Sequence, residues 1–187
     1  NAVDFEGSLQ DFFVFMREDD RFYFPNTDEG REDYLDLNNE YLDAITLKLP
    51  DYFGRLPKAE LEVRRVESFR EQAGAAQHYA SGTPDGSRPG VFYSHMSDMS
   101  TLPIFQLEDV AYHEGSPGHH LQISIQQELT SVPRFRTQYR TTAYTEGWGL
   151  YAEWLAKEMG AFEDPYSDFG RLSGELWRAI RLVVDTG

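Results

Sequence analysis

The sequence predicts a mainly helical α+β fold with a small antiparallel β element around residues 61–96. From residue 103 to residue 185, apolar side chains recur at the three- to four-residue spacing of amphipathic helices. Within 61–96, β-favouring residues fall instead in short runs, and the segment TPDGSRPG concentrates the Pro, Asp and Gly of a turn. The two patterns together favour helices that pack against a small sheet.

Sequence signals mark the ends of the predicted helices. Ser8 is placed to cap the first helix, and Pro50 ends the second. Pro103 suits the first turn of the third helix. Gly160 suits the end of the fourth, and Pro165 suits the start of the fifth. The predicted helices cover residues 8–18, 28–49, 103–129, 140–160 and 165–185.

Three segments favour strands, and we expect them to form an antiparallel unit of two or three strands: residues 61–70, 75–81 and 90–96. No repeat or linker interrupts the chain, so we expect residues 1–187 to form one domain. The first residues (NAVDFEGS) and the last (RLVVDTG) do not resemble natural termini. We therefore expect the chain to be a piece of a longer protein.

Composition excludes several classes of function. The formal net charge is −15, which repels phosphate backbones and anionic lipids, so we expect no nucleic-acid partner. No apolar run approaches the length of a membrane span, and no signal peptide opens the chain. The absence of cysteine excludes disulfides, thiolate metal sites and cysteine nucleophiles. Any transition-metal site must therefore use His, Asp or Glu.

The segment HEGSPGHH (113–120) holds three of the five histidines. Glu114 directly follows His113, and a His-Glu pair with a later His on a helix is typical of zinc peptidases. In such a site the histidines bind the metal and the glutamate takes a proton from the attacking water. Here the next histidines, His119 and His120, lie six and seven positions after His113 instead of the usual four.

An ideal helix could not bring these histidines together. Position i+6 is rotated by roughly 240° from i, and i+7 lies about 10 Å further along the axis. However, Gly115, Pro117 and Gly118 disfavour an ideal helix in this segment. We expect a kink or π-type bulge at residues 116–118 that returns His119 to the side of His113.

A catalytic zinc usually has three protein ligands and one open position. The segment TAYTEGWGLYAEWL offers Glu146 and Glu153, which lie seven residues apart and so share one helix face. Either carboxylate could complete the site. Gly147 beside Glu146 would let another backbone approach closely. The competing interpretations are chance histidines on a surface helix and an ion pair between Glu146 and Arg140.

Several of these segments resemble the DUF885 family: HEGSPGHHLQ, TAYTEGWGLYAE, LWRAIRLVVDTG, PDGSRPGVFYSHMSD and DPYSDFGRL. The resemblance runs from about residue 56 to residue 187. The family is bacterial, is often described as lipoproteins, and is grouped with glutamate-zincin metallopeptidases. The resemblance implies a helical zincin-like core, with zinc held by His113, His119 and Glu146. His120 is the lesser candidate for the second ligand.

The resemblance also has implications for the whole protein. The family has a long helical N-terminal part, and it continues past DTG into a segment that bears another histidine. The chain would therefore be the C-terminal catalytic portion of a longer protein, impaired or inactive if that histidine takes part in catalysis. Family habit places the protein in the periplasm or cell envelope, with the cytoplasm as the alternative.

For catalysis we expect Glu114 to be the general base. Tyr144, two residues before Glu146, is the first candidate to stabilise the oxyanion, and Tyr112 is the second. Arg178 or Arg181 would orient a substrate carboxylate. Core packing of the tyrosines and structural ion pairs of the arginines are the alternatives.

Asp185 and His120 are candidates to support a ligand imidazole from behind. The function that these expectations favour is a zinc-dependent peptide-bond hydrolase that acts on a peptide substrate, like a carboxypeptidase or dipeptidase. The alternatives are a non-catalytic, metal-stabilised binding domain derived from a peptidase and a zinc hydrolase of non-peptide amides or esters. The intact Glu114 argues against the non-catalytic domain.

Overall fold

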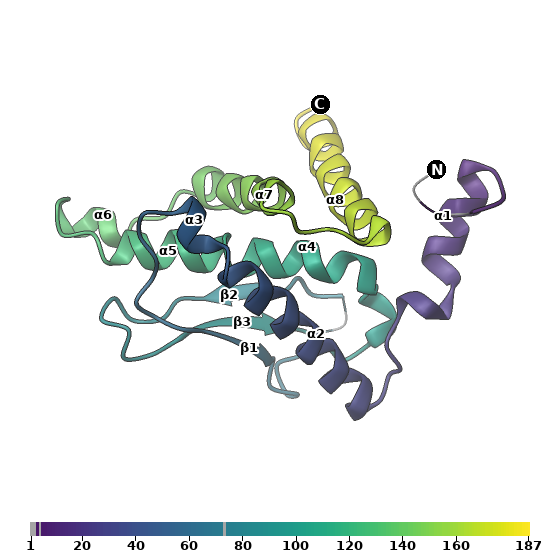
Figure 1. Cartoon of the computed structure of the whole chain (residues 1–187), viewed down its shortest axis with the longest axis horizontal. Coiled ribbons are helices and arrows are strands. Elements are labelled where there is room, and N and C mark those ends of the chain that lie inside the picture. The colour runs from purple at the N-terminus through teal and green to yellow at the C-terminus, as the bar shows by residue number, and fades with distance from the viewer. Residues whose placement is uncertain (1–2, 4, 73) are drawn as a thin grey trace.

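The structure of the chain, a computed structural model, describes residue 3, residues 5–72 and residues 74–187. It confirms the predicted fold class, because helices dominate and a small sheet lies along one side of α4 and α5 (Figure 1). The elements follow in the order α1 (Leu9–Glu18), η1 (Asp20–Phe22), α2 (Asp28–Thr46), α3 (Leu49–Tyr52), β1 (Leu61–Arg65), β2 (His78–Ala80), β3 (Gly90–Ser94), η2 (Met99–Thr101), α4 (Ile104–Glu114), α5 (His119–Gln127), α6 (Arg134–Gln138), α7 (Thr142–Glu158) and α8 (Pro165–Val184).

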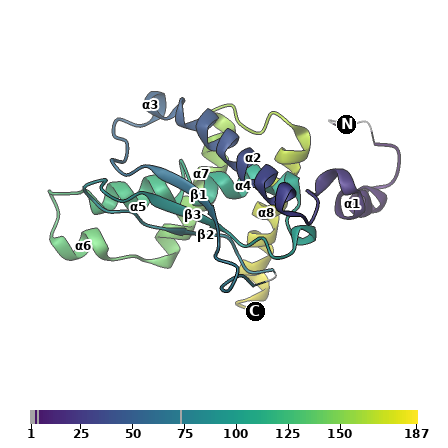
Figure 2. The ribbon, with the colours of Figure 1, turned by 90° about the horizontal axis from the view of Figure 1, so that it is seen from below.

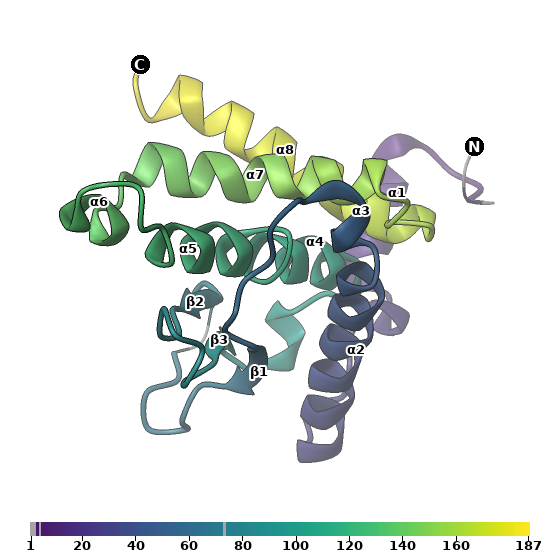
Figure 3. The same cartoon turned by 60° about the vertical axis from the view of Figure 1, so that its left-hand side comes forward.

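Helices α4 and α5 form the middle layer of the molecule. They follow one another roughly in line, with the sheet on one side and α7 and α8 on the other (Figure 3). Helix α2 packs against both α4 and β1 (Figure 2). Because α4 is covered on several sides, its second half is buried from Leu107 to Glu114 except at Val110. A polar residue in this half of α4 therefore lies in the protein interior, where hydrogen bonds and charge interactions are stronger than in water.

The small sheet is confirmed, but one of its two pairings differs from the antiparallel prediction. Strand β3 lies in the centre and pairs antiparallel with β2, as expected, whereas β1 pairs parallel with β3 in the register Leu61↔Gly90. The chain does not place β2 beside β1. Instead, β2 lies at the opposite edge of the sheet, and β3 later fills the position between them. The hairpin between β2 and β3 then lays β3 alongside β1 in the same direction. Local alternation of side chains does not record strand direction, so the sequence pattern missed this pairing.

Capping explains where the helices begin. Ser8 accepts a hydrogen bond from the Asp11 amide, and the Asp11 carboxylate accepts one from the Ser8 amide, which makes a capping box at α1. Thr27 caps α2, and Asp164 caps α8 ahead of Pro165. The predicted helix 28–49 ends at residue 46, and α3 follows as a separate turn.

The largest buried cluster joins the helices that carry the HEGSPGHH and TAYTEGWG segments. It contains Ile45 of α2, Leu49 of α3, Tyr112 of α4 and Ala156 of α7. A second cluster packs the fully buried Phe92 of β3 against α4. Burial of such side chains stabilises the fold by about 1.5–3 kcal/mol each, so α4 is fixed between the sheet and α7.

Within the described part of the chain, no helix has both the length and the apolar character that crossing a bilayer requires.

Candidate metal centre

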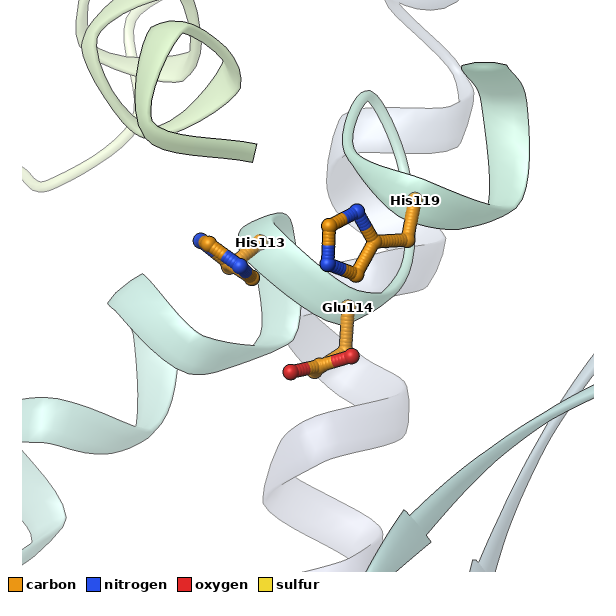
Figure 4. A group of neighbouring side chains, drawn as sticks. All are labelled: His113, Glu114 and His119. Carbon is orange, nitrogen blue, oxygen red and sulfur yellow. The ribbon is translucent and has the colours of Figure 1, made fainter. Parts of the chain in front are cut away.

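The predicted long helix 103–129 is interrupted at the expected place. Helix α4 ends at Glu114, residues 115–118 form a loop, and α5 begins at His119. The His120 amide donates to the Gly115 carbonyl at 3.0 Å, which closes a π-type turn with an i→i+5 hydrogen bond. Figure 4 shows the His119 ring turned back across this loop toward His113 and Glu114. The two imidazole rings lie 4.6 Å apart between centroids, so the break does bring His119 beside His113.

Gly118 and Trp148 hold this loop in place. A Cβ atom on Gly118 would lie only 2.0 Å from the His113 carbonyl oxygen, so no other residue fits there unless the backbone shifts. The indole Nε1 of Trp148 on α7 donates to the Pro117 carbonyl at 2.9 Å. The loop therefore depends on both a glycine in the chain and a donor from the next helix.

Helix α7 presents one face to His113. Glu146, Gly149 and Glu153 occupy positions i, i+3 and i+7 of this face. A Cβ on Gly149 would lie 2.5 Å from the His113 Cε1 atom, so this glycine lets the ring pack against α7. Gly147, which the sequence suggested for a close approach, has nothing within 4 Å of such a Cβ. The close approach is real, but it occurs at Gly149 because position 149 faces α4.

Glu153 orients the first histidine. Its Oε1 lies 2.6 Å from His113 Nδ1, and both side chains are buried. Arg178 Nη2 lies 3.2 Å from the same oxygen and 3.3 Å from Nδ1. Because a guanidinium can only donate, its bond is to the carboxylate, and the Nδ1–H of His113 also donates there. In the neutral ring this leaves the lone pair on Nε2, the atom that faces Glu146.

The Glu146 carboxylate bridges the two histidines. Its Oε2 lies 3.4 Å from His113 Nε2, and its Oε1 lies 3.6 Å from His119 Nε2. Ligands bound to zinc at about 2.0–2.1 Å in a tetrahedron are separated by about 3.3–3.5 Å, so these distances fit a zinc donor set. His113, Glu114 and His119 also offer ligand atoms within 4.8 Å of one another. Glu146 is a stronger candidate than Glu114 for the third donor, because Glu146 contacts both Nε2 atoms.

Glu114 is left without a contact to either histidine nitrogen. Its side chain is buried, and its Oε2 has no hydrogen-bond partner among the described residues. Burial raises the pKa of this carboxyl to about 7, although His113 lowers it and the backbone amide of Tyr79 does so further. A carboxyl that titrates near neutrality can accept and return a proton at physiological pH.

The two histidines differ in their electrostatics. Burial lowers the pKa of His113, but hydrogen bonds to Glu146 and Glu153 outweigh it and raise the value to about 9. Burial and the neighbouring His113 lower the pKa of His119. His119 is thus an unprotonated imidazole at neutral pH, whereas His113 must release a proton before its Nε2 can bind a metal.

His120 points away from this group. Its Nδ1 lies 3.1 Å from the Tyr79 hydroxyl, and its ring packs edge-on against Tyr79 of the sheet. Burial lowers its pKa to about 4. The alternative that the sequence left open is therefore settled in favour of His119 as the neighbour of His113. The described contacts of His120 are with the sheet, and none supports a ligand imidazole.

The structure places neither tyrosine candidate beside the histidines. Tyr144 is exposed and lines an apolar groove between α5, α6 and α7, and it does not line the cleft that holds His113. Tyr112 is buried in the core, and its hydroxyl donates to Glu108 at 3.1 Å. The structure thus places Tyr144, the predicted oxyanion donor, at the start of α7 outside the cleft.

Of the two predicted arginines, only Arg178 reaches the site, where it pairs with Glu153. Arg181 instead pairs with Asp185 at 2.7 Å on the exposed side of α8, so Asp185 does not support a ligand histidine. The carboxylate that does so is Glu153, which the sequence analysis had considered as a ligand. Neither the predicted substrate-clamp role of Arg181 nor the predicted supporting role of Asp185 fits the structure, because the last turn of α8 extends beyond the cleft.

The centre lies in a cleft of about 650 Å³ between α4, α7, α8 and β2. Its lining includes ionisable residues that the sequence did not predict as site residues, among them Asp109, Tyr79 and Arg140. Asp109 precedes His113 by four positions, a spacing that could have revealed it on the same face of α4. Burial and the nearby Glu153 raise the pKa of its carboxyl. No comparable local signal marks Tyr79 or Arg140, which the tertiary fold brings to the cleft.

Comparisons with known proteins agree with this fold. The family described as "Bacterial protein of unknown function (DUF885)" matches residues 1–187. Among solved structures, the chain resembles the "putative lipoprotein from Colwellia psychrerythraea", with a TM-score of 0.90 and 38% sequence identity over 97% of this chain. The chain spans 31% of the length of that protein. No curated protein matches the chain.

Proposed function

This chain belongs to the DUF885 family of bacterial proteins of unknown function, and from that premise we propose that it is a zinc-dependent peptide-bond hydrolase of the carboxypeptidase or dipeptidase type. The observation that carries the proposal is the convergence of His113 Nε2 and His119 Nε2 on the Glu146 carboxylate, at 3.4 and 3.6 Å. Two imidazoles and one carboxylate are the donors of many catalytic zinc sites. The Glu153 carboxylate behind His113 is the support that such ligands usually have.

A zinc ion held by these three residues would polarise a scissile carbonyl and make a water molecule acidic near neutral pH. Glu114 supplies the proton transfer. Its buried carboxylate accepts a proton as water adds to the carbonyl carbon. It then gives the proton to the leaving amine as the C–N bond breaks. The pKa of about 7 that burial gives this group suits both steps.

The wall of the cleft supports a peptide as the substrate. Strand β2 is an edge strand of the sheet, and His78 and Tyr79 of this strand line the cleft. An edge strand offers backbone donors and acceptors, and an extended peptide can pair with them while an ester of a simple alcohol cannot. A cleft of about 650 Å³ also has room for a few residues.

We further propose that the protein is located in the cell envelope, and more specifically in the periplasm. The Colwellia psychrerythraea protein that this chain resembles is described as a lipoprotein.

The proposal is tested with the purified chain, its bound metal and a mixture of short peptides. We expect about one zinc per chain and cleavage of peptides that mass spectrometry detects. Glu114→Gln should keep the zinc and reduce turnover by about 100-fold or more. His113→Ala and His119→Ala should lose the zinc, whereas Glu158→Gln, an exposed carboxylate at the end of α7, should change neither property.

Two outcomes would contradict the proposal. Zinc bound without cleavage of any peptide would identify a non-catalytic, metal-stabilised domain. Hydrolysis of non-peptide amides or esters with no cleavage of peptides would assign the same centre to another substrate class.

A further inference from the structure

Arg140 is a cation of the cleft without a carboxylate partner. It precedes α7, and among the described residues no Asp or Glu oxygen lies within 4.0 Å of its guanidinium nitrogens. Its Nη2 donates to the Ser81 hydroxyl at 2.9 Å, just beyond the end of β2. It lines the same cleft as His113, His119 and Glu146. A guanidinium carries several donors, so one hydrogen bond to a hydroxyl leaves most of them free.

The other guanidinium in the cleft is already occupied. Arg178 bonds to the buried Glu153 at 3.2 Å, and only a third of its side chain is exposed. Moving it to a substrate would leave the Glu153 carboxylate buried without a cation, which is costly. Arg140 has no buried carboxylate partner among the described residues, so it can turn toward a substrate without this cost.

Strand β2 gives the distance between Arg140 and the reacting groups. Tyr79 of β2 and Glu114 line the same cleft, and Ser81, two residues further along the chain than Tyr79, bonds to Arg140. Two residues of extended chain span about 7 Å. An extended substrate with its scissile bond near Glu114 would therefore bring an atom one or two residues further on within reach of the Arg140 guanidinium.

We propose that Arg140 binds the C-terminal carboxylate of a peptide substrate, one or two residues beyond the scissile bond. This inference rests on the proposed function for the meaning of the scissile bond, but the carboxylate site itself does not depend on turnover. The fork of a guanidinium matches a carboxylate with two parallel hydrogen bonds. The protein would thus release single residues or dipeptides from C-termini and would discriminate against amidated peptides.

Binding is measured first, in a Glu114→Gln background that prevents turnover, by calorimetry on the zinc-loaded chain. The probes are acetyl-Ala-Ala-Ala as a free acid, the same peptide as a C-terminal amide, and the amide of acetyl-Ala-Glu-Ala. We expect the acid to bind about tenfold more tightly than either amide, as for one charged hydrogen-bonded contact. Arg140→Gln should remove this preference while the amides bind as before. Arg140→Lys should restore part of it.

The matched control is Arg134→Gln, an exposed arginine of α6 that does not line the cleft. It should leave all three affinities unchanged. Equal binding of acid and amide, an equal loss for both in Arg140→Gln, or no binding of the acid would overturn the proposal. Tight binding of the Glu-containing amide would overturn it as well, because the carboxylate would then come from a side chain.

Turnover separates this inference from the proposed function. If the chain with Glu114 intact cleaves no peptide but the Arg140-dependent preference in binding persists, the hydrolase proposal fails and the carboxylate site stands. If acid and amide are cleaved alike, the hydrolase stands and the role of Arg140 fails. Mass spectrometry of the products should show one or two residues removed from the C-terminus.

Discussion

At the scale of single residues, the neighbours of His113 fix the orientation in which its ring would bind a metal. Glu153 holds the Nδ1 side at 2.6 Å, and Glu146 lies 3.4 Å from Nε2 on the other side. Gly149 leaves space for the ring between them. The ring is thus positioned from both edges and from one face. A change at any of these positions should affect metal affinity before it affects the fold.

Glu153→Gln tests the support behind His113. The amide keeps the shape of the side chain but removes the charge that favours a strongly donating imidazole. We expect zinc affinity to fall by about 10- to 100-fold, measured by competition with a fluorescent chelator. Glu158→Gln, an exposed change on the same helix, should have no effect. Equal zinc affinity for Glu153→Gln and the parent chain would refute the supporting role.

Gly149→Ala tests the space around the ring. The new Cβ would stand 2.5 Å from His113 Cε1, so the ring must turn away from the site. We expect a loss of zinc affinity of about tenfold or more, because a misplaced donor loses most of its bond. Gly147→Ala is the matched control, since its Cβ meets nothing within 4 Å. It should stabilise α7 by about 0.5–1 kcal/mol and leave zinc binding unchanged. Similar effects of the two alanines would contradict this account.

At the scale of elements, the site depends on how closely α8 approaches α4. Gly170 of α8 packs directly on the backbone of α4, where a Cβ would lie 1.8 Å from the Phe105 carbonyl oxygen. Arg178 lies eight residues, or about two helical turns, further along α8. The contact at Gly170 therefore sets the course of α8 that delivers Arg178 to Glu153.

Gly170→Ala should force α8 away from α4. We expect the free energy of unfolding to fall by about 1–3 kcal/mol in urea titrations, the usual cost of inserting an atom into a packed contact. Gly54→Ala, which meets nothing within 4 Å, should change it much less. A stability of Gly170→Ala equal to that of the parent would show that α8 does not rest on α4 at this point.

At the scale of the whole molecule, the buried ionisable groups link stability to pH. In the metal-free chain the pKa of His113 is raised from 6.5 to about 9. A raised pKa in the folded state means that protonation stabilises the fold fully below pH 6.5, and that this contribution is lost as the pH rises through 9. Burial also raises the pKa of the Glu114 and Asp109 carboxyls, so their ionisation likewise lowers the stability of the fold as the pH rises. The lowered pKa values of His119 and His120 affect the stability of the fold only below about pH 6.5.

We therefore expect the metal-free chain to lose stability between pH 6.5 and 9, with about 3 kcal/mol from His113. Urea unfolding in the presence of a chelator measures this loss. His113→Asn should flatten the dependence. Zinc should oppose it, because a metal binds the unprotonated imidazole and its affinity rises with pH. A metal-free chain that becomes more stable toward pH 9 would contradict the assignment of His113.

For the molecule as a whole, some features of the fold and of the candidate site can be predicted from the sequence alone. Periodicity located α1, α2, α7 and α8, because apolar side chains recur at helical spacing along each of them. Spacing placed the break at residues 116–118, since Pro and Gly act on the backbone locally. It also placed Glu146 and Glu153 on one face of α7. These features depend on residues within a few positions of one another, so one sequence is enough to predict them.

The sequence by itself thus determined the fold class, the broken helix and the donors His113, His119 and Glu146 as candidates. Only the tertiary structure decided that Glu153 supports His113, that Tyr144 faces away from the cleft, that β1 runs parallel to β3, and that Arg140 meets the end of β2. Each of these depends on how separate elements pack against one another. Burial and contact between distant segments leave no period or spacing in the chain, so they are settled when the elements come together.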